Sequence, residues 1–146
     1  MVRTKIRNFR KSDLKKIMEF KRQSVRLSFP RKKMNETRYK KKLLRYAKKQ
    51  PNGIKVVEDG EIAGYIWFSV EKNYLGRYGL VHHIYIDKKY RNLGLGKKLM
   101  KLAEGYFKRK EIKRIKVTIT LSNKPSLRMC KRLGYRESRI IMERFL

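Results

Sequence analysis

The chain has 146 residues, of which 40% are hydrophobic and 11% aromatic, enough to bury a core and too many for a disordered chain. It carries 42 Lys and Arg side chains against 12 Asp and Glu, a formal net charge of +30. A single cysteine excludes an intramolecular disulfide, and the longest unbroken apolar run, residues 65–68, is too short to cross a bilayer. Because residues 1–13 also lack an apolar signal segment, we expect one cytoplasmic domain over residues 1–146, with no membrane association.

The positive charge is concentrated at the two ends of the sequence. Residues 1–50 carry 20 basic and 3 acidic side chains, a net of +17, whereas residues 51–100 reach +3 and residues 101–146 reach +10. Such a field attracts polyanions, for example the phosphates of a ligand, an acidic protein or nucleic acid. The alternative interpretation is a set of solvated helix faces in an organism whose proteins are rich in lysine, as in thermophiles.

The first third of the chain predicts one strand and two helices. Thr4–Phe9 alternates polar and apolar residues, as a strand does. Ser12–Asp13 can cap a helix that runs through Lys21. A second helix is expected over about Asn35–Lys49, ended by Pro51–Gly53.

The middle of the chain predicts β-structure. Ile54–Val57 and Ile62–Val70 are apolar runs joined at Asp59–Gly60, a strong hairpin signal. A second turn is expected over residues 73–78, followed by a strand at Gly79–Ile86.

The last third predicts two more helices and two more strands. The first helix places Leu95, Leu99, Leu102 and Tyr106 on one face. The other elements are a β-rich run at Ile112–Leu121, a helix at Lys124–Leu133 capped by Asn123 and closed by Gly134, and a last strand at Tyr135–Phe145.

A glycine-rich stretch between the strand Gly79–Ile86 and the following helix predicts an anion site. Gly94 and Gly96 allow the backbone to approach a ligand without a Cβ in the way. The N–H groups of the first helical turn lack intrahelical partners and lie at the positive end of the helix dipole. A phosphate or pyrophosphate is therefore the expected ligand.

Spacing excludes two common phosphate-binding motifs. A P-loop needs Gly and then Ser or Thr at positions where this chain has Arg91 and Lys98. The dinucleotide fingerprint needs a third glycine where Leu99 stands.

Two separated motifs resemble those of the GCN5-related N-acetyltransferase (GNAT) family. Arg91, Gly94 and Gly96 match the Arg-x-x-Gly-x-Gly loop that binds the pyrophosphate of coenzyme A in that family. Residues 123–135 match its Asn-x-x-small-x-x-apolar-Tyr-x-x-x-Gly-aromatic segment, with Cys130 where the family usually has tyrosine. The matching positions are Asn123, Ser126, Met129, Gly134 and Tyr135. The resemblance extends from about Arg3 to the C-terminus and implies an α/β (α+β) fold, with a mixed central β-sheet flanked by helices and the order β-α-α-β-β-β-α-β-α-β.

The resemblance also implies which residues bind acetyl-CoA. Backbone groups of the strand before the loop are expected to contact the acetyl carbonyl, and the loop with the first helical turn is expected to bind the pyrophosphate. The candidate residues are Ile84, Tyr85, Ile86, Arg91, Asn92, Leu93, Gly94, Leu95, Gly96, Lys97, Asn123 and Ser126.

Few residues in this part of the chain could act as the general base that deprotonates the acceptor amine. Family members often carry a glutamate in this strand, at a position where the chain has Leu80. The only histidines, His82 and His83, are neighbours in the strand and should point to opposite faces. His82 shares the parity of Leu80, and an imidazole suits proton transfer near neutrality, so His82 is the expected base. His83 comes second because a β-bulge would invert the faces, and Glu71 is weaker; the alternative is that both histidines only pack.

Cys130 occupies the position of the family's proton-donating tyrosine. A thiol could return a proton to the departing thiolate of coenzyme A, although it is a weak hydrogen-bond donor. The alternative is a small buried side chain, and we favour that interpretation.

These observations predict an acyltransferase that moves the acetyl group of acetyl-CoA directly to a primary amine, with no metal. The acceptor could be a protein N-terminus, a lysine or a small amine, and the charge of residues 1–50 favours an acidic protein or peptide. A hypothesis of a different class is a basic GNAT-fold module that docks on nucleic acid or ribosomes with weak or no catalysis. The chain could be a monomer or a dimer.

Overall fold

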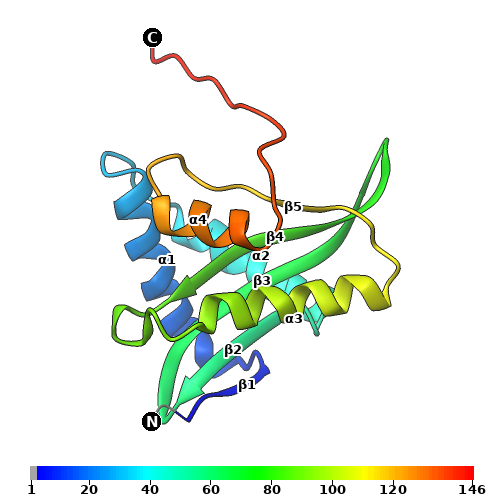
Figure 1. Ribbon diagram of the computed structural model, residues 1–146. Helices are drawn as coiled ribbons and strands as arrows, with labels where there is room; N and C mark the ends of the chain where they lie inside the picture. Colours follow the sequence, from blue (N-terminus) through cyan, green and yellow to red (C-terminus); the bar gives the residue numbers. More distant parts are fainter. Residues whose placement is uncertain (1–2) are drawn as a thin grey trace.

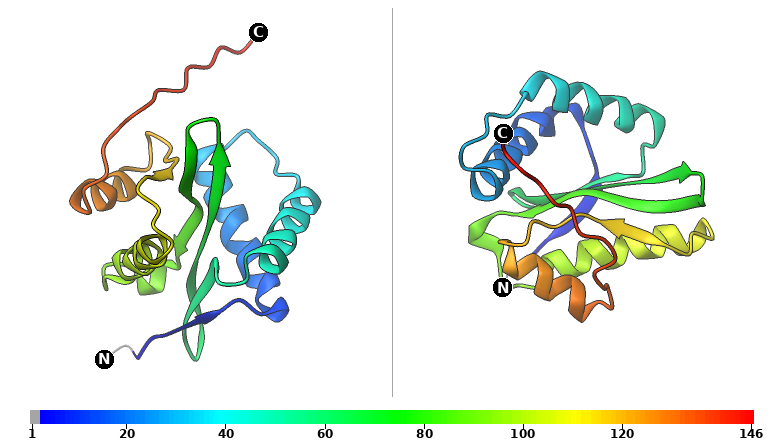
Figure 2. Two further views of the ribbon diagram at one scale, coloured as in Figure 1. Left: turned by 90° about the vertical axis from the view of Figure 1, so that its right-hand side faces the viewer. Right: turned by 90° about the horizontal axis from the view of Figure 1, so that it is seen from above.

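A five-stranded sheet lies between two pairs of helices in the computed structural model, which describes residues 3–146 and leaves residues 1–2 of the predicted domain outside it (Figure 1). The strands are β1 (Lys5–Asn8), β2 (Ile54–Asp59), β3 (Glu61–Asn73), β4 (Gly76–Ile86) and β5 (Ile115–Val117). The helices are α1 (Leu14–Ser28), α2 (Glu36–Lys49), α3 (Leu95–Arg109) and α4 (Lys124–Arg132), with 3₁₀ turns η1 (Lys11–Asp13) and η2 (Lys88–Tyr90). Helices α1 and α2 cover one face of the sheet, and α3 and α4 cover the other (Figure 2).

The sheet is mixed, as predicted. Its order is β1-β2-β3-β4-β5, in which the first four strands are antiparallel and β4 and β5 are parallel. β5 pairs only with residues 79–81 of β4, through Ile115, Lys116 and Val117. From His82 onward, β4 pairs with β3 alone among the described residues.

Alternate side chains of the central strands enter two separate cores. In β3, Tyr65 and Trp67 pack on the α1–α2 side, whereas Ile66 and Phe68 pack on the α3–α4 side. The core on the α1–α2 side holds Ile17, Phe20, Leu43, Ile54, Val56, Tyr65, Trp67 and Tyr85. The core on the other side holds Val57, Ala63, Ile66, Phe68, Val81, Leu95, Leu99, Met100, Ala103, Phe107, Ile112 and Cys130.

Helix α2 begins and ends as predicted, but α1 is longer than predicted. The Asn35 side chain accepts a hydrogen bond from Arg38 N at 3.1 Å and so caps α2. Helix α1 continues past Lys21 to Ser28, because no helix-breaking residue occurs before Pro30. It ends there because Phe29 precedes the proline, and a residue in that position disfavours helical geometry.

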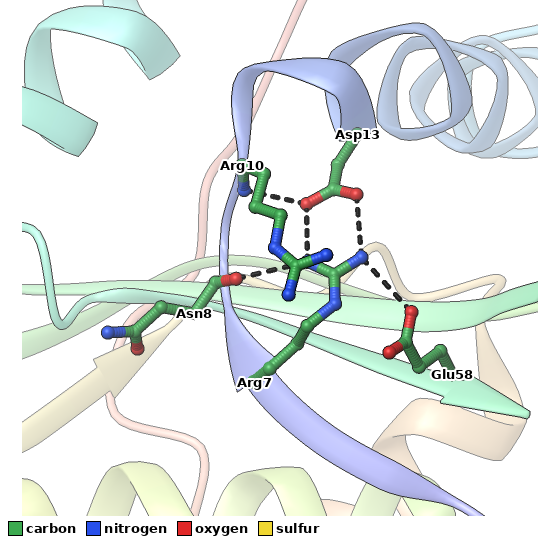
Figure 3. A network of polar contacts seen from close by, with 5 residues as sticks. All are labelled: Arg7, Asn8, Arg10, Asp13 and Glu58. Carbon is green, nitrogen blue, oxygen red and sulfur yellow. Dashed lines mark hydrogen bonds and ion pairs between the residues drawn. The ribbon is translucent and has the colours of Figure 1, made fainter.

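The sequence suggested that Asp13 caps α1, but its side chain makes no capping hydrogen bond to that helix. It lies instead in a buried polar network (Figure 3). It is 2% exposed, and its carboxylate accepts hydrogen bonds from both terminal nitrogens of Arg7 at 2.8 Å and from Arg10 N at 2.7 Å. Arg7 Nη2 also lies 3.1 Å from Glu58 Oε2. Burial alone would raise the pKa of Asp13, but the hydrogen bonds from Arg7 and Arg10 N outweigh burial and lower it. The network joins β1 and β2 to the turn that precedes α1.

Two predictions about the second half of the chain need correction. β5 spans only three residues of the β-rich run, and Ile112 instead closes the end of α3 through a hydrogen bond from its N–H to Phe107 O at 2.9 Å. The predicted last strand is absent: residues 136–146 have no secondary structure and extend away from the body (Figure 1). They pair with no strand among the described residues, so the expected element order lacks its final strand.

Candidate active site

A β-bulge in β4 places both histidines on the same face of the sheet. Trp67 lies opposite His83 and Phe68 lies opposite Val81, so His82 is the extra residue between them. His82 contacts Tyr46 of α2, and His83 contacts Ser24 of α1. The expectation that the two neighbours point to opposite faces is therefore wrong, because it assumed a regular strand.

His82 belongs to a polar chain that the sequence did not reveal. Its imidazole stacks on the Trp67 ring, with centroids 4.2 Å apart and an angle of 8° between the planes. Its Nε2 lies 2.6 Å from Ser69 Oγ, and Ser69 donates a hydrogen bond to Glu71 Oε2 at 2.5 Å. Tyr46 donates to the same Glu71 oxygen at 2.9 Å. Glu71 therefore receives two hydroxyl donors and is linked to His82 through Ser69.

His83 uses both ring nitrogens in hydrogen bonds within the fold. Nδ1 pairs with the Tyr65 hydroxyl, and Nε2 lies 3.1 Å from Ser24 Oγ. The Tyr65 hydroxyl also lies 3.1 Å from the Tyr39 hydroxyl. With both nitrogens engaged, His83 is arranged to hold α1 against the sheet.

Both histidines are neutral at pH 7, at pKa values far below those expected from sequence. Burial, and then repulsion by Lys42, lowers the pKa of His82 to about 4, with partial opposition from Glu71. Burial, and then repulsion by Lys21, lowers the pKa of His83 to about 3. The expectation that His82 titrates near neutrality is thus wrong, because its ring is packed against aromatic side chains beside a cation.

The glycine-rich loop has the geometry of an anion site. Gly94 precedes α3 with φ of 78°, in the left-handed region that favours glycine, and Asn92 has φ of 63°. The first intrahelical bond of this turn runs from Lys98 N to Gly94 O at 3.0 Å. No side chain of the described residues caps α3, so its first-turn N–H groups can bind an anion.

Arg91 connects the loop to the end of β4. Its Nε donates a hydrogen bond to Ile86 O at 2.9 Å, and its guanidinium carbon lies 5.3 Å from the centre of the Tyr85 ring. The Tyr85 side chain points toward α1, where its hydroxyl donates to Gln23 Oε1 at 2.7 Å. Arg91, Lys97 and Leu93 are exposed, and the coenzyme contacts expected of the loop stay predictions.

The two sequence motifs lie against each other in the fold. A Cβ on Gly96 would come within 3.0 Å of Met129 Sδ, so glycine at this position lets α4 approach the start of α3. Asn123 accepts a hydrogen bond from Ser126 N at 3.4 Å and caps α4, and Gly134, with φ of 95°, ends it as predicted. The predicted coenzyme contacts of Asn123 and Ser126 therefore involve residues at the start of α4.

Cys130 lies in the α3–α4 core and is 4% exposed. Burial, and then the nearby Glu104, raises the pKa of its thiol, which is therefore protonated at neutral pH. Tyr135, five residues later, donates a hydrogen bond from its hydroxyl to Glu104 Oε2 at 2.7 Å. This environment favours a packing role for Cys130, and its role as a proton donor stays a prediction.

Residues 3–146 contain neither a candidate metal site nor a candidate membrane span. No group of three or more His, Cys, Asp or Glu side chains there could hold a metal ion. No helix in the same range is long and apolar enough to span a membrane.

A model of the acetyltransferase (GNAT) family matches residues 14–135 of the sequence. The chain belongs to this family. This match confirms the predicted family and fold. It also confirms the predicted class of enzyme, an acyltransferase, at the level of the family. A comparison with curated proteins finds no match.

Solved structures of GNAT proteins share the fold at low sequence identity. A GCN5-related N-acetyltransferase from Ralstonia eutropha JMP134 is 18% identical with a TM-score of 0.78, over 98% of this chain and 99% of that one. Glucosamine-6-phosphate N-acetyltransferase from Arabidopsis thaliana is 21% identical with a TM-score of 0.72, over 98% of each chain. AAC(6')-Iy, in complex with the bisubstrate analog CoA-S-monomethyl-acetylneamine, is 18% identical with a TM-score of 0.72, over 99% of each chain.

Sequence reasoning missed Ser69 and Tyr46 as members of the candidate site. Ser69 is fully buried near the end of the apolar part of β3, residues 62–70, and it shares a face with Trp67 and Glu71 by the period of two. A serine within an apolar run, two residues before a glutamate, was therefore the signal that the sequence offered for this site. Tyr46 lies on a predicted helix face, and nothing in the sequence indicated that it would reach Glu71.

Proposed function

We propose that this GNAT protein transfers the acetyl group of acetyl-CoA to a primary amine bound beside His82. The observation that carries the proposal is the end of the β4–β5 ladder at Val81 and Val117. Beyond it, one edge of residues 82–86 is unpaired within the described part of the chain, and the same segment leads to the anion-binding loop. Unpaired backbone groups at this edge could hydrogen-bond the amides of a pantetheine chain, and the neighbouring helix N-terminus could bind its pyrophosphate.

The residues present fit acetyl-CoA on the donor side. When bound, the coenzyme supplies a thioester whose acetyl group is transferred. The first-turn N–H groups of α3 would bind the pyrophosphate, with Lys97 adding charge. Backbone donors of Ile84–Ile86 would orient and polarise the acetyl carbonyl.

On the acceptor side, the polar chain supports a proton route from the amine to Glu71. Because Ser69 donates to Glu71, the His82 Nε2–H donates to Ser69, which leaves the lone pair on Nδ1. Nδ1 accepts the amine proton, the Nε2 proton moves to Ser69 Oγ, and the Ser69 proton moves to Glu71. With a pKa of about 4, His82 holds a proton poorly, so passing it on suits this residue better than keeping it.

The charges around the two histidines favour an acceptor with negative charge near its amine. Lys42 Nζ lies 5.9 Å from the centre of the Trp67 ring on which His82 stacks, and Lys21 Nζ lies 5.0 Å from the centre of the Tyr39 ring. Both cations therefore lie near the histidines. A carboxylate or phosphate on the acceptor would be attracted, and a polycation would be repelled. Acidic peptides and amino-sugar phosphates are therefore the acceptor classes we favour.

The test is release of free thiol from acetyl-CoA in the presence of an amine panel, with mass spectrometry of the products. The panel contains an acidic peptide, a basic peptide, glucosamine-6-phosphate and an aminoglycoside. Amine-dependent thiol release with an acetylated product is expected. Thiol release without acetylated product, or binding of acetyl-CoA with no turnover on any amine, would contradict the proposal.

A second candidate function is docking on nucleic acid or ribosomes, and the net charge of +30 favours it. Such binding would weaken steeply with salt, because it releases counterions from the phosphates. Titration of single-stranded and duplex RNA at near-physiological salt distinguishes it from acetyl transfer. Micromolar or tighter affinity together with no turnover on any amine would favour this second function.

A further inference from the structure

A hollow of about 550 Å³ lies between β2 and the second half of α3. The helix begins at Leu95 and rises about 1.5 Å per residue, so the part that lines the hollow starts about 10 Å from the glycine-rich loop. No step of the proposed acetyl transfer uses this hollow. Three of its lining residues are cations, and the full set is Asn52, Lys55, Leu102, Tyr106, Arg109 and Lys110.

Within residues 3–146, the three cations of the hollow take part in no ion pair. Glu104, the one acidic residue in the sequence of α3, accepts a hydrogen bond from Tyr135 and borders a different hollow. Three like charges around one hollow repel each other. That repulsion costs free energy, and an anion bound between the cations would remove the cost.

Lys55 reaches the hollow from the sheet and is held in place there. It is half-buried, and its Nζ donates a hydrogen bond to Asn8 Oδ1, directly opposite on β1. Burial, and then repulsion by Arg109, lowers the pKa of Lys55. Cations at the end of a helix offset the helix dipole, which accounts for Arg109 and Lys110. It does not account for a half-buried lysine of β2 beside them.

The remaining wall of the hollow is aromatic and aliphatic. The Tyr106 ring packs against Phe68, with ring centres 5.3 Å apart, and Lys110 Nζ lies 5.7 Å from the centre of the Tyr106 ring. Leu102 lies one turn before Tyr106 and adds apolar surface. The hollow therefore combines a cluster of cations with a wall that suits the organic part of a ligand.

We propose that this hollow binds a phosphomonoester, a small molecule with a terminal phosphate on a sugar or nucleoside. Such a phosphate carries a charge of about −1.5 to −2 at pH 7 and three acceptor oxygens, which complements Lys55, Arg109 and Lys110. The Asn52 amide and the Tyr106 hydroxyl are further donors in the lining. The volume exceeds that of a bare phosphate and lies within the range of about 300–1,000 Å³ of small-molecule sites.

The first experiment locates the ligand by nuclear magnetic resonance, with adenosine 5′-monophosphate titrated into the isotope-labelled chain. Saturating coenzyme A is present throughout, so that its own phosphates compete for the glycine-rich loop. The largest shifts are expected at Asn52 and residues 102–110, with smaller shifts at residues 91–97. Adenosine should bind at least tenfold more weakly, because it lacks the charge-assisted hydrogen bonds of the phosphate. Shifts confined to residues 91–97, or equal affinity for adenosine, would overturn the proposal.

Charge variants separate the hollow from the overall charge of the protein. Lys55→Gln should weaken binding of adenosine 5′-monophosphate at least tenfold, while the Tm of the free protein is unchanged or higher because repulsion is relieved. The matched control is Lys108→Gln, which makes the same charge change in the last turn of α3 but outside this hollow. It should weaken binding by less than about twofold, because exposed charges are screened.

Arg109→Gln, at an exposed position, repeats the test in case Lys55→Gln lowers the folded fraction, and it should also weaken binding. Equal losses in Arg109→Gln and Lys108→Gln would assign binding to the net charge and overturn the proposal.

A last ligand distinguishes a phosphomonoester from the backbone of a nucleic acid. The dinucleotide adenylyl-(3′→5′)-adenosine carries one phosphodiester, with a single negative charge, and no terminal phosphate. It should bind the hollow at least tenfold more weakly than adenosine 5′-monophosphate, because its phosphate has less charge and fewer free oxygens. Equal or tighter binding of the dinucleotide at residues 102–110 would show a site for a phosphodiester backbone and would overturn the proposal.

Discussion

His82 and His83 are neighbours in sequence but point to the same side of the sheet, because His82 is the bulged residue opposite Trp67 and Phe68. Their surroundings differ: His82 connects to Glu71 through Ser69, whereas both nitrogens of His83 are engaged within the fold. We therefore expect His82→Gln to lower kcat about a hundredfold, within the range of general acid–base catalysis, with unchanged affinity for acetyl-CoA. Steady-state kinetics and coenzyme titration measure the two effects.

Two further variants make that prediction specific. Ser69→Ala breaks the link to Glu71 and should lower kcat about tenfold while leaving the His82 ring on Trp67. His83→Asn should change stability more than kcat. If His83→Asn lowers kcat as much as His82→Gln at equal folded fraction, then His82 is not the group that receives the amine proton.

The lowered pKa values of the two histidines predict how stability depends on pH. They are about 4 for His82 and about 3 for His83 in the fold, against 6.5 for a free side chain. Below 6.5 the unfolded chain binds more protons, so the stabilisation is fully present above 6.5 and is lost as pH falls toward 4 and 3. Each histidine can contribute at most about 1.4 kcal/mol per pH unit to this slope.

Urea unfolding at pH 7, 6 and 5 measures the slope, which should flatten in the His83→Asn variant. Titration of the imidazoles by nuclear magnetic resonance gives the pKa values directly. Values near 6.5 for both rings would contradict the described packing and would restore a neutral-pH role for His82.

Local signals in the sequence predicted the parts of the site that depend on local structure. The glycine loop, the cap of α4 at Asn123 and its end at Gly134 each follow from a residue type at a fixed position. The hairpin at Asp59–Gly60 is of the same kind. These features could be read because each depends on a few consecutive residues.

Features that depend on pairing between distant residues could not be predicted. The bulge at His82 is set by the register of β3 against β4, and neither strand alone carries a signal for it. The role of Asp13 depends on Arg7 and Glu58 from two different strands. The segment after Tyr135 has the composition of a strand, yet a strand also needs a partner edge, which sequence pattern does not supply.

The buried network around Asp13 should contribute strongly to stability. Asp13→Asn removes the charge that pairs with Arg7, but Arg7 keeps Glu58 as a partner. The loss should therefore be smaller than the cost of about 3–5 kcal/mol for a buried charge left without any partner. Because the pKa of Asp13 is lowered, its stabilisation is present above its unfolded value and is lost as pH falls through the folded value. Chemical unfolding at pH 7 measures the loss. The control is Glu19→Gln, which breaks the exposed pair with Lys16 and should change stability by less than about 1 kcal/mol.

The coenzyme loop can be tested with charge changes on α3. Lys97→Glu places a negative charge in the first turn, where the pyrophosphate is expected, and should weaken acetyl-CoA binding at least tenfold. Lys101→Glu makes the same charge change one turn further along and should weaken binding less. The rise in Tm with added acetyl-CoA measures the affinity of each variant. Equal losses would indicate that the net charge of the protein, and not the loop, governs binding.

Gly96 tests the contact between the two motifs. A methyl group at this position meets Met129 Sδ at 3.0 Å, so Gly96→Ala should displace α4 slightly and lower both Tm and coenzyme affinity. Gly96→Glu should abolish coenzyme binding, because it adds a larger side chain and a negative charge. Unchanged affinity in a correctly folded Gly96→Glu variant would contradict the assignment of the loop.

The final prediction concerns the charge of the acceptor. Lys21 and Lys42 act on the histidines of the candidate site, and residues 1–50 carry a net of +17, so kcat/KM should be higher for acidic than for basic peptides with the same N-terminal residue. The preference should shrink as salt rises, because exposed charges are screened beyond about 8–10 Å at physiological ionic strength.

Lys42→Glu separates the local effect from the general field. It changes the net charge by the same amount as Lys72→Glu, in the distal part of β3, but it alone alters the charge beside His82. We expect the preference for acidic peptides to fall at least threefold with Lys42→Glu and little with Lys72→Glu. Equal effects of the two variants would assign the preference to the overall charge. A preference for basic peptides in the parent protein would show that contacts within the pocket outweigh the field of the lysines.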